Sequence, residues 1–331
     1  MANNAKDNMN FAQRVGYYLL LGGAKLIGYL PYCVLYYVLA PFISFVLYRL
    51  LGYRVGVVRG NLAAAFPEKS EEERRAIERN FYRHLAEIFV DVIDMTSMSP
   101  RELKKRMVVE NQTETDAAIG TRNWIAALAH YGEWEYFSVY SIDHPYHNIG
   151  VYHPLSSKIM DRFMLYIRRR FGMEVAPMNG LARPVMKNLK AKEQMALGLI
   201  ADQRPRFRES DKVWRTFLNQ PSLFFGGIGN YAKKFGMMVY TLDIVKVKPS
   251  HYRCNFVQLY DGEEDISEQE IMDRYVAEVE RIIRRAPELW LWSHRRWKNK
   301  PSAKPATVGA EPMKSEDTPT LSTANPENNN A

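Results

Sequence analysis

Cysteine is scarce in this sequence, which has 331 residues but only Cys33 and Cys254. Two cysteines cannot build a disulfide framework, and they argue against a cysteine-based metal site. Hydrophobic residues make up 47% of the chain, which is too many for a disordered protein. Its length is enough for one large domain or two modest ones with a sizeable core.

Acidic residues are outnumbered by basic ones, 37 to 45, which gives a formal net charge of +8 at pH 7. The excess lies outside residues 299–331, which carry a net charge of −1, so that the other 298 residues carry +9. A basic protein of this kind suits an anionic partner. Nucleic acid, anionic lipid and an acidic protein all fit the charge alone.

Charge is missing altogether from Leu26 to Leu47, a run of 22 residues. A run this long and apolar predicts a membrane segment, although a buried core helix is the alternative. Pro31 and Pro41 can kink or break it, so a tilted helix, a kinked helix and a shallow hairpin all fit. More basic residues follow the segment closely than precede it, which favours a cytoplasmic C-terminal domain.

These shifts in composition divide the chain into four predicted parts. Residues 1–14 form an N-terminal flank, and residues 15–51 form the membrane anchor segment. Residues 52–298 form the folded domain. Residues 299–331 have no aromatic residue and many Pro, Ser, Thr and Asn, which predicts a disordered tail.

The folded domain alternates between helical patterns and short apolar runs. Capping boxes at Ser70-x-x-Glu73 and Ser267-x-x-Glu270 predict the starts of two helices. Strands alternating with helices predict an α/β fold, with a mixed sheet flanked by helices. The predicted strands are Trp124–Ala129, Met195–Ile200, Met237–Val247 and Cys254–Tyr260.

The candidate site follows the first of these strands, in the run WIAALAHYGEWEYF. Strand ends are where α/β sheets bind ligands. His130 and Glu135 are five residues apart, so they could not meet on one helix. They can meet if His130 lies in the loop after the strand and Glu135 lies in the next helix, and Glu133 is an equally available carboxylate. A histidine held by a carboxylate is a general base, whereas the alternative is a surface histidine near two glutamates.

Other kinds of site are less well supported. The pattern Gly226-Gly227-Ile228-Gly229 has no serine, so the sequence has no convincing nucleophile elbow and direct transfer is simpler than a covalent acyl-enzyme. The histidines at 130, 144, 147 and 153 match no common zinc signature. Basic residues are spread over helix ends without a recognition motif, which argues against nucleic acid.

The sequence resembles the lipid A late acyltransferase family, the lauroyl and myristoyl acyltransferases of the larger lysophospholipid acyltransferase group. The family's H-x-G-N-W-E block stands here as His130-Tyr131-Gly132-Glu133-Trp134-Glu135. Further blocks occur in the family's order. Before His130 stands Asn61-Leu62-x3-Phe66-Pro67, and after it stand Asp161, Arg168-Arg169-Arg170-Phe171-Gly172, Ala201-Asp202-Gln203, Phe224-Phe225-Gly226 and the closing run from Pro287 to Lys298.

The resemblance implies a glycerolipid-acyltransferase-like fold and a catalytic domain over residues 52–298. It implies transfer of an acyl chain from acyl carrier protein to a hydroxyl of a phosphorylated lipid A precursor, at the cytoplasmic side of the inner membrane. No cofactor and no metal are implied. His130 would be the base and Glu135 would orient it. Arg169 or Arg170 would contact phosphate or the oxyanion, and Asp202 and Gln203 would bind substrate.

Several of these residues also have a purely structural interpretation. The three arginines at 168–170 also suit a solvated helix end. The tryptophans at 290, 292 and 297 are best explained as core or membrane-interface residues. The basic domain would attract both anionic substrates, an effect that salt screens. The sequence gives no indication of oligomeric state.

Three places depart from the family pattern and bear on the acceptor, one of them Gly229-Asn230-Tyr231 after the F-F-G block. Glu133 replaces the usual asparagine, and a second carboxylate there would raise the pKa of His130. His153 stands where arginine is common. The same chemistry on a phosphatidylinositol mannoside or an aminolipid is therefore an alternative, as is a non-catalytic membrane-tethered protein that binds lipid or carrier protein.

Overall fold

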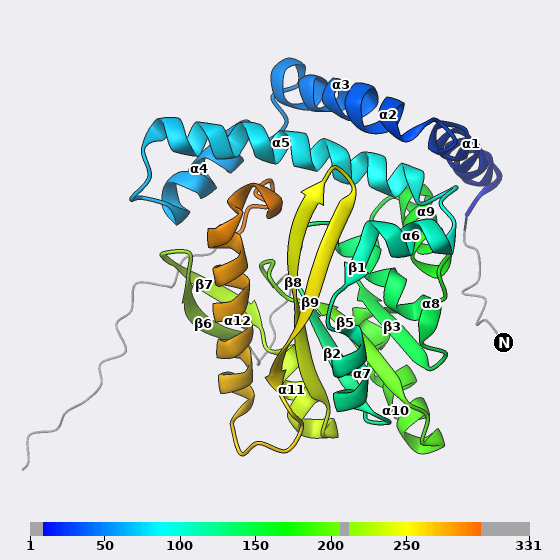
Figure 1. Ribbon diagram of the computed structural model, residues 1–331, viewed down its shortest axis with the longest axis vertical. Helices are drawn as coiled ribbons and strands as arrows, with labels where there is room; N and C mark the ends of the chain where they lie inside the picture. The colour runs from blue at the N-terminus through cyan, green and yellow to red at the C-terminus, as the bar shows by residue number, and fades with distance from the viewer. Residues whose placement is uncertain (1–8, 206–211, 299–331) are drawn as a thin grey trace, which may run out of the picture. The chain divides into compact units, whose positions relative to one another are not determined.

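The computed structural model describes residues 9–205 and 212–298 (Figure 1). The tail predicted at 299–331 lies outside the described residues, as does most of the N-terminal flank. The prediction of an α/β fold with a mixed sheet flanked by helices is confirmed. The division into four parts stays a prediction.

A sheet of seven strands forms the centre, in the order β1-β9-β8-β2-β5-β3-β4. Every neighbouring pair is parallel except β8 and β9. All residues of β2 are buried, as expected for a central parallel strand covered on both faces. The strands are β1 (Met107–Val109), β2 (Trp124–Leu128), β3 (His147–Tyr152), β4 (Glu174–Pro177), β5 (Met195–Ile200), β8 (Met238–Lys248) and β9 (His251–Tyr260), and β6 (Lys212–Phe217) and β7 (Gln220–Phe225) form a separate hairpin.

The predicted capping boxes are confirmed. Ser70 caps α5 (Glu71–Asp94) and Ser267 caps α12 (Glu268–Arg285), and in each case the third helical residue is a glutamate that bonds back to the cap. The other helices of the domain are α4 (Val55–Ala65), α6 (Pro100–Arg106), α7 (Gln112–Ile119), α8 (Tyr140–Asp143), α9 (Lys158–Arg169), α10 (Ala182–Ala191), α11 (Gly227–Phe235) and the short η3 (Trp134–Val139), η4 (Met178–Gly180) and η5 (Pro287–Leu289).

The apolar N-terminal segment forms two helices rather than one. The chain leaves α1 (Phe11–Gly28) before Pro31 and re-enters a helix that is continuous from Tyr32 to Leu50. This second helix consists of α2 (Tyr32–Val34), η1 (Leu35–Leu39), α3 (Ala40–Phe45) and η2 (Val46–Leu50). Proline has no amide hydrogen to donate, and the wide π turn of η1 directly before Pro41 accommodates it without a break.

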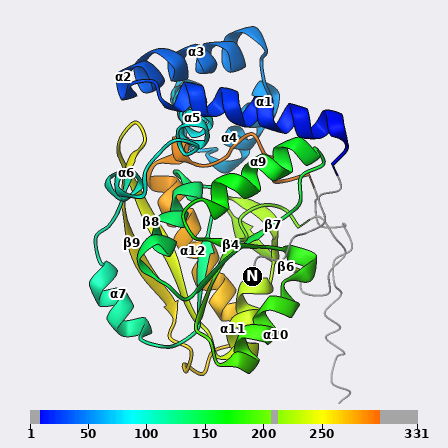
Figure 2. The same ribbon diagram turned by 90° about the vertical axis from the view of Figure 1, so that its right-hand side faces the viewer.

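Both apolar helices lie against α5, which crosses one end of the sheet (Figures 1 and 2). Gly28 approaches this helix so closely that a Cβ there would lie 3.1 Å from the carbonyl oxygen of Ile93. Tyr36 reaches into the domain and donates a hydrogen bond of 2.6 Å to Oδ1 of Asp91. The segment therefore packs on the domain along much of its length, although many of its other side chains remain exposed.

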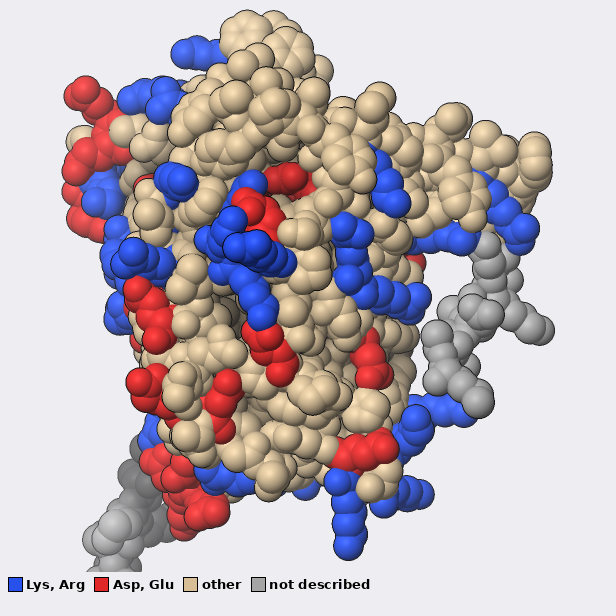
Figure 3. All heavy atoms as spheres, turned by 45° about the vertical axis from the view of Figure 1, so that its right-hand side comes forward, with Lys and Arg blue, Asp and Glu red and all other residues tan. Residues whose placement is uncertain are grey.

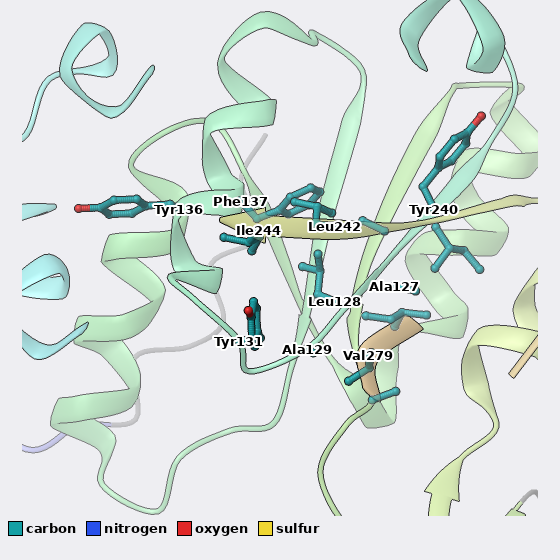
Figure 4. Packing of buried hydrophobic residues seen from close by; sticks show 14 of the residues in the cluster. Ala127, Leu128, Ala129, Tyr131, Tyr136, Phe137, Tyr240, Leu242, Ile244 and Val279 are labelled. Carbon is teal, nitrogen blue, oxygen red and sulfur yellow. The ribbon is translucent and has the colours of Figure 1, made fainter. Parts of the chain in front are cut away.

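The core around the end of β2 supports the candidate site. Leu128 and Ala129 pack there with Leu242 and Ile244 of β8, and the chain then turns at Tyr131 (Figure 4). The turn is held by backbone hydrogen bonds to the segment after α12: Gly132 donates to the carbonyl of Leu289, and Leu291 donates to the carbonyl of His130. The loop that carries His130 is thus fixed between the sheet and the C-terminal part of the domain.

Candidate active site

His130 and Asp202 meet because two parallel strands end in register. Leu128 of β2 pairs with Ile200 of β5, and each functional residue follows two positions after its strand. The carboxyl ends of parallel strands lie at the same edge of a sheet, where ligands commonly bind. Strand register therefore brings together two residues that are 72 positions apart in the chain.

Asp202 holds the ring and the backbone of His130. Nδ1 of His130 lies 2.8 Å from Oδ1 of Asp202, and the amide of His130 donates to Oδ2 at 3.1 Å. The indole Nε1 of Trp290 also donates to Oδ2, at 2.8 Å. The Asp202 side chain is 1% exposed and that of His130 is 21% exposed, so the carboxylate is shielded while the imidazole remains accessible.

The charge state of Asp202 follows from these contacts. Burial raises its pKa, but the charge of a protonated His130 and the hydrogen bonds from His130 and Trp290 outweigh burial and hold the pKa below its ordinary value of 3.8. Asp202 is therefore ionised at neutral pH. A carboxylate on Nδ1 selects the tautomer with the proton on Nδ1 and leaves Nε2 to accept a proton.

Glu135, the residue predicted to orient His130, has a different partner in the structure. It lies in the first turn of η3, and Arg168 of α9 donates to both of its oxygens, from Nε at 2.8 Å and from Nη2 at 2.5 Å. This bidentate ion pair is largely buried, with side-chain exposures of 7% for Glu135 and 23% for Arg168. An effect of Glu135 on His130 stays a prediction, because the ring contact in the structure is with Asp202.

These residues line one cavity of about 370 Å³. His130, Glu135 and Arg168 supply its polar side chains near the end of β2, and Gln203 and His153 also line it. Asp161 accepts a hydrogen bond of 2.7 Å from the amide of Leu155 and so holds one wall of the cavity. The rest is mainly apolar: Leu128, Trp134, Phe137, Val151, Pro154, Leu155, Met173, Met178, Ile200 and Phe225.

The predicted phosphate-binding arginines lie elsewhere. Arg170 donates to the backbone carbonyl of Met98 at 2.6 Å, and Arg169 is exposed. Among the described residues, Arg168 is the arginine of this helix end that lines the cavity. The sequence favours Arg169 or Arg170 for this contact, whereas the helical phase of α9 places Arg168 at the cavity.

Glu133 lies in the interior of the domain. Its side chain is fully buried, and its Oε1 accepts a hydrogen bond of 3.3 Å from the backbone amide of Glu135. Burial raises its pKa well above the ordinary value of 4.5, and the neighbouring carboxylates of Asp91 and Glu135 raise it further. Burial and the neighbouring carboxylates therefore favour the neutral carboxyl form of Glu133.

Trp290 is the residue that the sequence analysis missed at this site. Its indole bonds Asp202, and its backbone forms an isolated β-bridge with Tyr131. Trp290 is 2% exposed, which agrees with its interpretation as a core residue, but its indole N–H also contacts Asp202 at the site. In the described part of the chain, no group of three or more His, Cys, Asp or Glu side chains could hold a metal ion.

The comparisons with known proteins give the family. A search of curated proteins finds no match for this sequence. The family model described as bacterial lipid A biosynthesis acyltransferase matches residues 3–299, which is most of the chain. This match supports acyltransferase activity of the lipid A type at the level of the family. The chain belongs to the bacterial lipid A biosynthesis acyltransferase family.

Proposed function

We propose that this protein transfers a fatty acyl chain from acyl carrier protein to a hydroxyl group of a lipid A precursor, with His130 as the general base. The observation that carries the proposal is an accessible His130 whose Nδ1 is bound to the buried carboxylate of Asp202, in a cavity that also has apolar walls. A base beside space for an acyl chain suits acyl transfer to an alcohol.

In the proposed reaction, Nε2 of His130 takes the proton of the acceptor hydroxyl. The hydroxyl oxygen attacks the thioester carbonyl, and a tetrahedral intermediate forms. When this collapses, the carbon–sulfur bond breaks and His130 returns the proton to the leaving thiol. Asp202 stabilises the imidazolium that exists between these steps, as a buried carboxylate does for other histidine bases.

Arg168 is the cation available for negative charge in this mechanism. Its Nε and Nη2 are bound to Glu135, and Nη1, which has no hydrogen-bond partner among the described residues, can bind an oxyanion or a phosphate of the acceptor. A guanidinium suits both because its donors form a rigid planar fork. In this proposal Glu135 is a positioning residue that fixes Arg168.

The apolar N-terminal helices support association with a membrane. Among the described residues, the helix Tyr32–Leu50 is long and apolar enough to cross one, and 22% of its most apolar window is buried. Figure 3 shows the surface over α1 to α3 as mostly uncharged, with Lys and Arg along its margin. We infer that these helices bind the inner membrane and that the domain faces the cytoplasm.

The test is acyl transfer by the full-length protein in vesicles, with acyl carrier protein as donor and a lipid A precursor as acceptor. Wild-type protein should transfer the chain, and His130→Ala should lower kcat by about 10²–10⁴. The matched control is His147→Ala. His147 begins β3, at the end of the strand that does not line the cavity, and is bound by Glu174 and Glu193. Wild-type rates in His130→Ala would refute the mechanism.

Lipid analysis of a deletion strain separates the possible acceptors. Loss of one acyl chain from lipid A would support the proposed acceptor. An unchanged lipid A with an altered phosphatidylinositol mannoside or aminolipid would assign the same chemistry to another lipid. If no lipid changes and the purified protein shows no turnover, the non-catalytic binding function is left.

A further inference from the structure

A second cavity of about 390 Å³ lies behind the loop that carries His130. It is bounded by α5, by the second half of β8 and by the segment at the end of α12 that continues into η5, and these elements converge in Figure 1. Among the described residues, it shares no lining residue with the cavity of the active site. The turn at Tyr131 and Gly132 separates the two.

The floor of this second cavity contains polar groups without hydrogen-bond partners. His84 is 2% exposed, and neither of its ring nitrogens has a partner of normal geometry in the described structure. The hydroxyl of Tyr131, which is 1% exposed, also lacks a hydrogen bond of normal geometry, although the Arg285 guanidinium lies near it. Buried polar groups are normally hydrogen-bonded, so unsatisfied ones that line a cavity indicate a ligand or solvent that completes them.

His84 is neutral in this position. Burial lowers its pKa well below 6.5, and the charge of Lys246 lowers it further, while the nearby backbone of Gly132 acts in the opposite direction. A neutral imidazole carries one N–H donor and one acceptor. It can therefore donate to an oxygen of a ligand without adding a charge to the interior.

Charged side chains surround the mouth of the cavity, and one of the cations has no carboxylate partner among the described residues. Its lining includes three cations, Arg83, Lys246 and Arg285, but only two carboxylates, Glu87 and Glu288. Lys246 pairs with Glu87 at 2.6 Å, and Arg285 is bound by Asp243 just outside. Arg83 is exposed and, among the described residues, makes only a long contact of 3.5 Å with the amide oxygen of its neighbour Asn80.

We propose that this second cavity binds the phosphoryl group of an organic phosphate, with Arg83 and Lys246 at the mouth and His84 donating from the floor. An arginine fork and an ammonium suit phosphate oxygens. The volume exceeds that of a phosphate, and Ile244, Val245, Ala286 and Leu289 supply apolar surface for the organic part. The ligand is a soluble phosphate ester or a phospholipid headgroup, and the experiment distinguishes these sources.

The experiment follows the histidine side-chain resonances of full-length, detergent-solubilised protein during titration with glycerol phosphate and, separately, with inorganic phosphate. The chain has seven histidines, and His84→Gln assigns the His84 resonance by its disappearance. Vesicles of phosphatidylcholine with and without phosphatidic acid form the lipid arm. We expect a saturable shift of the His84 resonance, with affinity reduced at least tenfold in Arg83→Ala and in Lys246→Met.

The controls separate this site from the active site. Arg79→Ala removes an exposed arginine one turn earlier on α5 that does not line the cavity, and His130→Ala alters only the catalytic cavity. Both should bind as the wild type does. A rise of the thermal midpoint with phosphate that Arg83→Ala abolishes gives a second readout, since Arg83 is exposed and its loss should not impair folding.

The outcomes decide both the site and the source. A response to soluble phosphates assigns a soluble ester, and a response only to phosphatidic acid assigns a lipid headgroup. If the His84 resonance responds to no phosphate, or responds equally in both mouth variants, the proposal is wrong. None of these readouts depends on acyl transfer, so failure here and failure of the proposed catalysis are distinguishable.

Discussion

Both oxygens of Asp202 are committed, to the ring and amide of His130 and to the indole of Trp290. We expect Asp202→Asn to lower kcat by about 10²–10⁴ with a smaller change in KM, because an amide can turn its NH₂ toward Nδ1 and favour the wrong tautomer. Steady-state kinetics on the reconstituted enzyme measures this.

The matched variant is Glu135→Gln, which removes the charge from the partner of Arg168. We expect it to raise KM for the acceptor more than it lowers kcat. The reverse ranking, with Glu135→Gln the more damaging to kcat and Asp202→Asn nearly silent, would restore Glu135 as the residue that orients His130.

Glu133 gives a prediction about pH. Burial raises the pKa of its carboxyl well above 4.5 in the folded protein, whereas the unfolded chain has the ordinary value of 4.5. A raised folded pKa stabilises the fold at low pH, and this contribution is lost as the pH rises from 4.5 toward the folded pKa. We therefore expect the free energy of unfolding of Glu133→Gln, relative to wild type, to increase between pH 5 and pH 8.

Denaturant unfolding at several pH values measures the effect. Glu72→Gln, an exposed glutamate in the first turn of α5, is the control and should follow the wild type at every pH. A relative stability of Glu133→Gln that falls with pH would show that Glu133 is ionised in the folded protein.

Several site residues could be predicted from the sequence, and others could not. His130 directly follows a strand that is apolar enough to recognise, and Asp202 stands two residues after the next predicted strand. Aligning these two strand ends would have paired them. Arg168 could not be separated from Arg169 and Arg170, because the phase of α9 depends on its packing. Nothing in the local pattern around Trp290 shows that its indole would reach Asp202.

At the scale of elements, the turn after β2 depends on Gly132. Its φ is +62°, and a Cβ there would lie 2.9 Å from Cγ2 of Ile244. We expect Gly132→Ala to destabilise the protein by about 1–2 kcal/mol from backbone strain alone, and to lower kcat because His130 shifts. Chemical denaturation and kinetics on the same preparation measure both effects.

The matched control is Gly60→Ala in α4, where the backbone is helical and a Cβ would meet nothing within 4 Å. Alanine should be neutral or slightly stabilising there. If Gly132→Ala behaves like Gly60→Ala, the turn is not strained and its geometry does not position the base.

Elements with strong local signals were predictable, whereas those that depend on distant partners were not. The capping boxes and the apolar strands β2, β5 and β8 lie close to their predicted positions. β3 and β4 were missed because β3 contains polar residues and a glycine and β4 has only four residues. Their strand conformation comes from pairing with β5 and with each other, since strand preference depends strongly on context.

At the scale of the whole molecule, we expect the exposed apolar side chains of the N-terminal helices to set the affinity of the protein for membranes. Phe42 is 61% exposed and Phe45 is 53% exposed, and burying a phenylalanine is worth about 1.5–3 kcal/mol. We expect Phe42→Ser together with Phe45→Ser to weaken partitioning into vesicles by about 10²-fold or more. Flotation with vesicles measures the partition.

Trp214→Ser is the matched control, because Trp214 is 41% exposed but lies on the hairpin of β6 and β7. It should leave partitioning unchanged. If the double phenylalanine variant partitions as the wild type does, membrane binding depends on another surface.

Because Tyr36 donates a hydrogen bond to Asp91, the apolar segment is part of the folded domain, and another membrane helix cannot simply replace it. Tyr136, which follows Glu135 in the chain, donates to the same Asp91 oxygen at 2.9 Å, and Arg106 donates to the Tyr36 hydroxyl at 3.3 Å. If residues 1–51 were deleted or replaced by an unrelated membrane helix, the buried side chains of Asp91 and Arg106 would lose the hydroxyl of Tyr36 as a hydrogen-bond partner. Attempts to obtain a soluble enzyme by trimming should therefore yield aggregated protein, whereas surface substitutions that keep Tyr36 should yield a soluble and active one.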